Sequence, residues 1–385
     1  MMERIPLTEE ELGSKLAKLL SPSTPEKILE GFARGLVPGF SPDQMLKGYY
    51  QLALRGDTWY ELVKDTLVKL PEATYFSAFS AGLPPPVLGF LASQPIPASV
   101  LPKLVMLPET PGDAIADIAR HAPESLCIVI GDNQARLLQH PPIIESLYMN
   151  PNTPMSLSMR IIELAARNRL QLQLAAYDEM VKALELDEDA FDDPLDAELA
   201  QAEVDERFKA AAAEADGRDW DIGEKNDAED GQKEDGQEEE SNGENDLSRP
   251  DADVPRNLGS LPVFARIRLA QLGNRFMRSQ LIRDSNKLVA MAVIKSPGMT
   301  DIEVEEYSKN RQLSEDVIRY IAHRKDWLKS YKVKSNLVNN PKTPVTVALQ
   351  LLSHLRDNDL RAVARSRNVQ QAVRSAALQR LNAKK

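Results

Sequence analysis

The chain has 385 residues, of which 42% are hydrophobic and only 5% aromatic, and its formal net charge is −11. Such a length suffices for two or three domains, and the abundance of Leu and Ala favours close-packed helices over a β-sandwich. No stretch approaches the ~18 consecutive apolar residues of a membrane-spanning helix, and the first residues lack the features of a signal peptide. A single cysteine, Cys127, excludes an intrachain disulfide and a cysteine-based metal cage. We therefore expect a cytoplasmic protein without membrane contact.

The charge is distributed very unevenly along the chain. Residues 1–183 carry a net charge of −4, residues 184–246 carry −21, and residues 254–385 carry +15. The acidic middle stretch has few apolar residues and cannot offset the entropy of ordering. The predicted domains are an N-terminal helical-repeat block (residues 1–185), an acidic and mostly disordered linker (residues 186–258), and a basic C-terminal helical-repeat block (residues 259–385).

In the N-terminal block, the first predicted helix covers residues 9–20. A second one opens at Thr24-Pro25, because proline is tolerated in the first turn of a helix. Its apolar face consists of Leu29, Phe32, Ala33 and Leu36. Further on, the short apolar run from Leu126 to Ile130 is the best strand candidate, but helix signals flank it. We interpret this run as a buried helix.

One stretch of the chain occurs twice, at residues 150–170 and at residues 340–360, with six identical positions. In the second copy, Thr343 is the expected N-cap and Pro344 the first helical residue. The stripe that follows has a helical spacing and consists of Ala348, Leu351, Leu352 and Leu355. Its counterparts in the first copy are Ser158, Ile161, Ile162 and Ala165. A stripe this narrow must be covered by neighbouring helices.

The spacing of such helix starts indicates a repeat architecture. Thr110 and Thr153 are 43 residues apart, which falls within the ~40–47 residues of HEAT-type repeats. A second internal match relates residues 302–321 to residues 358–377, at an offset of 56. Both offsets cannot be one repeat length, so we take the unit to be a single helix with its turn. The predicted fold is all-α, a HEAT-like α-solenoid in two blocks separated by the disordered acidic linker.

Four segments of the C-terminal block carry a resemblance to a known family. They are Leu281–Ala290, the Asn310–Ser314 turn, Asn339–Pro344 and Ala364–Val369. In these segments the chain resembles a family of bacterial cytosolic proteins with HEAT-like or leucine-rich-repeat-variant helical repeats. The similarity is clearest over residues 261–381 and looser in the N-terminal half. The resemblance implies an all-α solenoid and does not imply any activity.

The sequence has no motif of a catalytic, metal or cofactor site. The four histidines, His121, His140, His323 and His354, do not pair at the spacing of metal ligands. The glycine-containing stretches lack the Gly-Lys-Ser/Thr ending of a phosphate-binding loop. Cys127 lies between apolar residues, which favours a buried and inert thiol. We therefore predict neither an enzyme nor a bound cofactor or metal.

Basic and aromatic residues alternate in one part of the C-terminal block, a composition that a phosphate backbone or an acidic peptide would select. The candidate residues for an anionic partner are Arg319, Arg324, Lys325, Trp327, Lys329, Lys332 and Lys334. A second interpretation is a solvated helix face whose aromatic side chains belong to the core between repeats. We favour this second interpretation.

The leading functional hypothesis is a non-catalytic protein-interaction scaffold or adaptor, because stacked helical repeats build extended binding surfaces. Its partner would be another protein, which the sequence does not identify. The alternative is a nucleic-acid-binding module that uses the basic C-terminal block. In that alternative the acidic linker, tethered next to the basic block, would mask it.

Overall fold

The computed structural model describes residues 5–187, 204–206, 208 and 258–383. All regular structure in these residues is helical and none of it is a strand, which confirms the all-α prediction. The run from Leu126 to Ile130 lies within a helix, as expected. None of the described helices combines the length and the apolar character that crossing a lipid bilayer requires. The chain divides into two compact units, Met1–Tyr177 and Asp178–Lys385, which we call unit 1 and unit 2.

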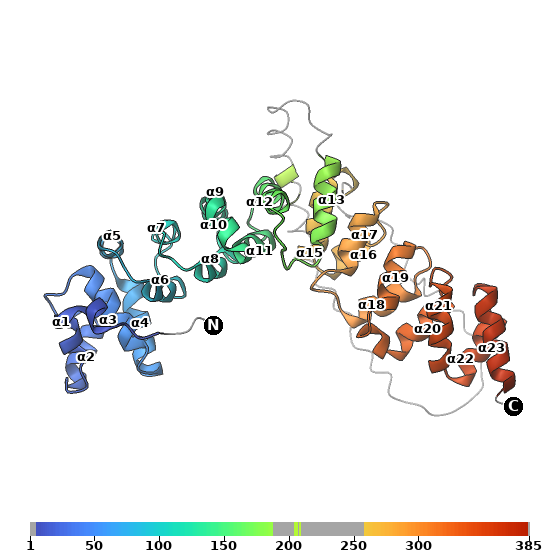
Figure 1. The fold of residues 1–385 in the computed structure, drawn as a ribbon, viewed down its shortest axis with the longest axis horizontal. Coiled ribbons are helices and arrows are strands. Elements are labelled where there is room, and N and C mark those ends of the chain that lie inside the picture. Colours follow the sequence, from blue (N-terminus) through green and yellow to red (C-terminus); the bar gives the residue numbers. More distant parts are fainter. Residues whose placement is uncertain (1–4, 188–203, 207, 209–257, 384–385) are drawn as a thin grey trace, which may run out of the picture. The chain divides into compact units, whose positions relative to one another are not determined.

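Unit 1 consists of short helices joined by turns, most of which contain proline (Figure 1). The helices are α1 (Glu9–Leu19), α2 (Glu26–Ala33), α3 (Pro42–Ala53), α4 (Asp57–Lys69), α5 (Glu72–Ala81), α6 (Pro85–Ala92), α7 (Leu101–Met106), α8 (Gly112–Ala119), α9 (Glu124–Asp132), α10 (Gln134–Gln139), α11 (Pro141–Met149) and α12 (Met155–Arg167). The first predicted helix, over residues 9–20, is therefore confirmed.

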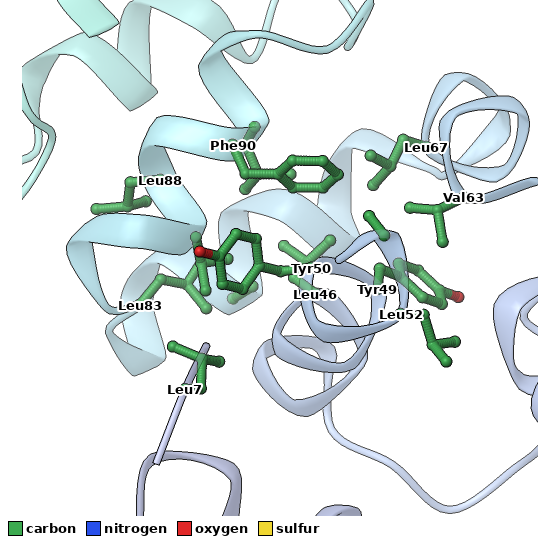
Figure 2. Close-up of a cluster of buried hydrophobic side chains, with 14 of the residues drawn as sticks. Leu7, Leu46, Tyr49, Tyr50, Leu52, Val63, Leu67, Leu83, Leu88 and Phe90 are labelled. Atoms are coloured by element: carbon green, nitrogen blue, oxygen red, sulfur yellow. The ribbon is translucent and has the colours of Figure 1, made fainter. Parts of the chain in front are cut away.

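The N-terminal core of unit 1 is built around α3, which packs against α1, α2, α4, α5 and α6. Because α3 is surrounded, it buries residues on most of its circumference, including Leu46, Tyr49 and Tyr50. Figure 2 shows these side chains between Val63 and Leu67 of α4 and Leu88 and Phe90 of α6. The rings of Tyr50 and Phe90 are 5.5 Å apart and tilted, a favoured geometry for aromatic pairs.

Four turns of the chain share the pattern Pro-x-Thr-Pro, with threonines at positions 24, 110, 153 and 343. The helix after each turn begins one residue beyond the second proline. Thr343 was predicted as an N-cap, but its hydroxyl instead donates backwards to the carbonyl of Leu337, at 2.7 Å. Thr110 makes the same bond to Leu104, also six residues earlier, at 2.6 Å. The threonine therefore closes the preceding helix rather than opening the next, and Pro344 is the N-cap.

The predicted stripe is buried in both copies, although in the second copy the α-helix ends at Leu351 and Leu355 has extended backbone after η4 (Leu352–His354). Ala348, Leu351, Leu352 and Leu355 are all buried, as are Ser158, Ile161, Ile162 and Ala165. The asparagine before each of these helices is buried as well, and it holds the helix pair that precedes it. Asn150 Nδ2 donates to the carbonyls of Ala119 and Ala122, both at 2.8 Å. Asn340 Nδ2 donates to the carbonyls of Ser308 and Asn310, at 3.0 and 3.1 Å.

Unit 2 contains most of the remaining described helices, and from η2 onward short turns separate them (Figure 1). They are α13 (Tyr177–Asp187, which begins at the last residue of unit 1), η2 (Leu258–Ser260), α15 (Val263–Leu272), α16 (Arg275–Leu281), α17 (Lys287–Ile294), α18 (Asp301–Lys309), α19 (Glu315–His323), η3 (Trp327–Lys329), α20 (Tyr331–Asn339), α21 (Val345–Leu351), η4 (Leu352–His354), α22 (Asp357–Arg365) and α23 (Gln371–Ala383). An ion pair of 2.7 Å between Glu179 and Lys295 joins α13 to the end of α17.

In parts of each unit, consecutive helices can be grouped in pairs whose members pack on the corresponding members of the next pair. The first helices of successive pairs pack on one another, α8 on α11 in unit 1 and α18 on α20 and α20 on α22 in unit 2. Second helices do so as well, α9 on α12 and α21 on α23. Equivalent helices start 26–31 residues apart. The 56-residue offset of the sequence therefore spans two pairs, whereas the 43-residue interval joins a first helix, α8, to a second helix, α12.

The predicted linker, residues 186–258, lies mostly outside the described residues. Within it, residues 204–206 and 208 are helical. Phe208 is only 3% exposed, and its ring lies 5.0 Å from the guanidinium carbon of Arg268 in α15. Arg268 is itself fully buried. At this point the acidic stretch therefore contributes to the core of unit 2, which the prediction of a linker did not anticipate.

Candidate functional site: two equivalent grooves

In unit 1, the packing of α8 against α11 leaves a groove of about 440 Å³. It is lined by Asp113, Ala116, Asp117, Arg120, Pro142, Glu145, Ser146, Met149, Gln173 and Leu174. Asp113 and Asp117 lie one turn apart on α8 and are both exposed. Glu145, on α11, accepts a hydrogen bond of 2.6 Å from the backbone N–H of Gln173. The groove therefore has a polar rim with three carboxylates and one guanidinium.

In unit 2, the packing of α18 against α20 leaves a second groove, of about 350 Å³. It is lined by Glu305, Glu306, Lys309, Tyr331, Lys332, Ser335, Asn336 and Asp359. Six of these residues occupy the helix positions that line the groove of unit 1. On the first helix they are the fifth, sixth and ninth positions from its start, and on the second they are the second, fifth and sixth. Equivalent helix pairs thus form equivalent grooves in the two units.

The carboxylates in the groove of unit 2 are occupied by neighbouring side chains. Glu305 accepts a hydrogen bond from Ser330 at 2.9 Å and lies 3.6 Å from Lys332 Nζ. Arg275 donates to Glu306 at 2.7 Å. The hydroxyl of Tyr331 donates to Asp359, and partial burial together with this bond raises the pKa of Tyr331. These contacts fix the polar groups of this groove in place.

Asn336 forms the floor of the same groove. Its Nδ2 donates to the carbonyl of Glu305 at 3.0 Å and lies 3.1 Å from the hydroxyl of Ser308. Both partners belong to α18, so the side chain bridges α20 to the first helix of the preceding pair. In unit 1 the equivalent position is Ser146, which is too short for the same bridge. The two grooves thus share their positions but differ in chemistry.

The residues predicted to bind an anionic partner are distributed over α19, the turn that follows it, η3 and α20, and only Lys332 lines a groove. Arg319, on α19, pairs with Glu315 one turn earlier. Lys329 pairs with Asp326 at 2.8 Å, and this hydrogen bond raises the pKa of Lys329. Three of the predicted cations therefore already have a carboxylate partner. Lys325 is exposed and Lys334 half-buried, and neither has an ion pair within the described part of the chain.

The predicted aromatic platform, Trp327, is half-buried and already in contact with a cation. Its ring meets that of Tyr320 edge to face at 6.0 Å. The guanidinium of Arg324 lies 5.1 Å from the Tyr320 ring and 5.9 Å from the Trp327 ring. Arg324 Nε also donates to the Tyr320 hydroxyl at 3.1 Å. Arg324 and the two rings thus form one packed cluster, and a nucleobase would have to displace the guanidinium in order to stack there.

Within the described residues no three His, Cys, Asp or Glu side chains lie close enough together to hold a metal ion. Cys127 is fully buried and its Sγ is 3.5 Å from the carbonyl of Ala122. The groove residues themselves were not predicted from the sequence. The sequence carries no signal for them, since at the 190-residue offset of the repeated stretch α11 and α20 share only Leu147 with Leu337.

Comparison with known proteins finds no matching family model, no matching curated protein and no matching solved structure. The function therefore has to be inferred from the two grooves. Their fixed carboxylates, amide and hydroxyl groups can hold a polar ligand by hydrogen bonds and charge. Their lining, repeated at the same helix positions, is suited to binding.

Proposed function

We propose that this protein is a non-catalytic, cytoplasmic interaction scaffold, built as a HEAT-like α-solenoid whose grooves bind another protein. One observation carries the proposal, namely that the same six helix positions line a groove in each unit. Stacked helix pairs repeat their surface from pair to pair, and solenoids use such repeated surfaces to bind extended partners. A catalytic centre depends instead on one unique constellation of side chains.

The chemistry of the grooves supports a peptide as the ligand. Each groove combines carboxylates with at least one cation and with side-chain or backbone hydrogen-bonding groups. An extended peptide offers N–H and C=O groups along its length together with charged side chains. Volumes of about 440 and 350 Å³ match a few peptide side chains rather than a globular surface.

Site-specific photo-crosslinking in the native cells tests the proposal. The crosslinking amino acid p-benzoylphenylalanine would replace Pro142 or Lys332, the exposed residues at the second position of α11 and of α20. Matched controls carry it at Ile128 and Arg319, which are exposed on second helices of the pairs. We expect the groove positions to capture a common set of proteins that the controls do not capture. Capture of no protein, or of the same proteins from all four positions, would refute the scaffold.

The alternative, nucleic-acid binding, has less support. Arg319, Lys329 and Lys332 have carboxylate neighbours, and Arg324 covers the two aromatic rings. A phosphate backbone would have to compete with these internal partners. We therefore do not adopt nucleic-acid binding as a second function, and the salt dependence of oligonucleotide binding by the full chain tests this choice.

A further inference from the structure

The groove of unit 2 contains its own cations, and that of unit 1 has prolines in their place. Lys332, at the second position of α20, lies 3.6 Å from Glu305. The equivalent residue of α11 is Pro142. Arg275, which pairs with Glu306, is the first residue of α16, and the residue 190 positions before it is Pro85, the first residue of α6. The carboxylate at the sixth position of the first helix, Glu306, is thus paired with a cation in unit 2, whereas its equivalent in unit 1, Asp117, lacks the corresponding side chain; the equivalent of Glu305 is Ala116.

Among the described residues, the carboxylates of the unit 1 groove have no cationic partner. Asp113 and Asp117 are one turn apart on α8, so their carboxylates lie on the same face and repel each other. Within the described part of the chain, neither of them has an ion pair. Arg120 is the single cation in the lining, against three carboxylates that include Glu145. An external cation would relieve this repulsion.

A second, independent observation concerns Ser146 on the floor of the groove. Its side chain is only 5% exposed and lines the groove, yet its hydroxyl has no hydrogen-bond partner among the described residues. The hydroxyl is not among the polar atoms that are sealed from solvent without a partner, so water or a ligand in the groove can reach it and satisfy it. The equivalent residue of unit 2, Asn336, has its amide nitrogen fully engaged with α18. The unit 1 groove thus offers a hydroxyl acceptor next to the two carboxylates.

We propose that the groove between α8 and α11 binds a cationic side chain, arginine or lysine, of an extended partner peptide. The head group would lie between Asp113 and Asp117 and donate to the Ser146 hydroxyl. The aliphatic stem would lie against Met149 and Leu174, as long cationic side chains commonly do on apolar surfaces. This inference rests on the proposed scaffold function and specifies the chemistry of its partner.

Selection from a library of random short peptides with the full-length chain tests the inference, and the enriched peptides are then measured by fluorescence anisotropy. We expect the enriched peptides to share an arginine or a lysine. Replacement of a shared arginine by citrulline removes its charge and keeps its shape, and replacement of a shared lysine by acetyl-lysine removes its charge and adds an acetyl group. Either change should weaken binding about tenfold. Enriched peptides without a shared cation, or equal binding of the neutral analogues, would overturn the inference.

Variants of the groove locate the site. In the full-length chain, Asp113→Asn with Asp117→Asn should weaken the selected peptide about tenfold. Glu61→Gln with Asp65→Asn is the matched control, because it removes the same number of charges at the same spacing on exposed positions of α4. The control should leave the affinity unchanged. An equal loss in both double variants would mean a nonspecific charge effect and would overturn the inference.

Pro142→Lys gives a further test, because it installs in unit 1 the cation that unit 2 already has. We expect this variant to weaken the peptide as well, because position 142 lines the same groove and an ammonium there would repel the incoming cation and draw on the groove's carboxylates. Unchanged peptide affinity in this variant would contradict the proposed site. Crosslinking from position 142 without any preference for cations would overturn this inference and leave the scaffold standing. Conversely, a failed crosslinking experiment would refute the scaffold even where cationic peptides bind.

Discussion

The carboxamide nitrogen of Asn150 lies 2.8 Å from the carbonyl oxygen of Ala119, the last residue of α8. The carbonyls at a helix end have no partner within the helix and need one from elsewhere. Asn150 is fully buried and supplies that partner from the end of α11, one helix pair later. Asn340 bonds in the same way to Ser308, near the end of α18. One side chain therefore joins successive helix pairs in both units.

We predict that Asn150→Ala lowers the free energy of unfolding by about 1–3 kcal/mol, because the buried carbonyl of Ala119 loses its donor and that of Ala122 keeps only the longer contacts from Asn152 and Cys127. Asn168→Ala is the control, since Asn168 is exposed and donates only to Leu164 within its own helix region. Its effect should stay within about 0.5 kcal/mol. Urea unfolding of the full chain, followed by circular dichroism, measures both variants. Equal stability of the two variants would show that Asn150 does not join the helix pairs.

A buried ion pair ties α16 to α18 in unit 2. Arg278 Nε and Nη2 donate to the two carboxylate oxygens of Glu303, at 2.8 and 3.0 Å. Glu303 also accepts from the backbone N–H and the hydroxyl of Thr300, at 3.0 and 2.8 Å. Burial acts to raise the pKa of Glu303, but the hydrogen bonds from Arg278 and Thr300 outweigh it and leave the pKa below its ordinary value. The carboxylate is therefore fully satisfied in its charged form.

We predict that Glu303→Gln lowers the free energy of unfolding at neutral pH by about 3 kcal/mol, because it leaves the Arg278 guanidinium buried without a counter-charge. A lowered folded-state pKa stabilises the fold above the unfolded-state value of about 4.3 and loses this contribution as the pH falls through the folded-state value. The difference in the free energy of unfolding between the wild type and Glu303→Gln should therefore become smaller below about pH 4. Chemical unfolding at a series of pH values measures it. Glu306→Gln, at an exposed pair with Arg275, should cost less than about 1 kcal/mol. A gap independent of pH would contradict the role assigned to the Glu303 carboxylate.

The sequence predicted what depends on local pattern. The stripe of Ala348, Leu351 and Leu352 was identified from its spacing alone, and it is buried. Leu36 was placed on a similar stripe but is 73% exposed, because α2 ends at Ala33 and Gly35 turns the chain with a φ of +72°. The direction of the Thr343 hydroxyl could not be predicted either. A threonine before a proline can bond forward or backward, and only the position of the preceding helix decides.

The grooves were beyond sequence reasoning for a different reason. Their lining residues are surface positions on two helices that are not adjacent in the chain, and equivalent positions such as Pro142 and Lys332 share no chemistry. Nothing in a single sequence marks them. By contrast, the pairing of Lys329 with Asp326, three residues earlier, follows from helix-like spacing. That pairing was available from the sequence and reduces the apparent basicity of the predicted site.

Gly48 is closely packed, whereas Gly31 has room for a larger side chain. A Cβ added at Gly48, in α3, would lie 2.5 Å from the Phe32 ring, whereas one at Gly31, in α2, would have only an ordinary 3.6 Å contact with Val37. Gly48→Ala should therefore destabilise the chain by about 1–3 kcal/mol through overpacking. Gly31→Ala should stabilise it by about 0.5–1 kcal/mol through helix propensity. Thermal unfolding of both variants tests this difference in sign. A stabilising Gly48→Ala would show that Phe32 has room to move away.

The predicted cations of unit 2 are either free to bind anions or neutralised by carboxylates of the same chain, and the salt dependence of nucleic-acid binding distinguishes the two cases. In the predicted set, Arg319, Lys329 and Lys332 have carboxylate partners, and three cations, Arg324, Lys325 and Lys334, have none among the described residues. Each phosphate contact with a single strand contributes about −0.7 to the slope of log K against log salt concentration. Three free cations give a slope of about −2, and all six would give about −4.

Titration of a labelled single-stranded oligonucleotide with the full chain, at several salt concentrations, measures the slope. We expect a value no steeper than about −2 and binding that is lost near about 0.15 M salt. A slope of about −4 that falls when Lys325→Gln and Lys334→Gln are combined would instead establish this surface as a nucleic-acid site.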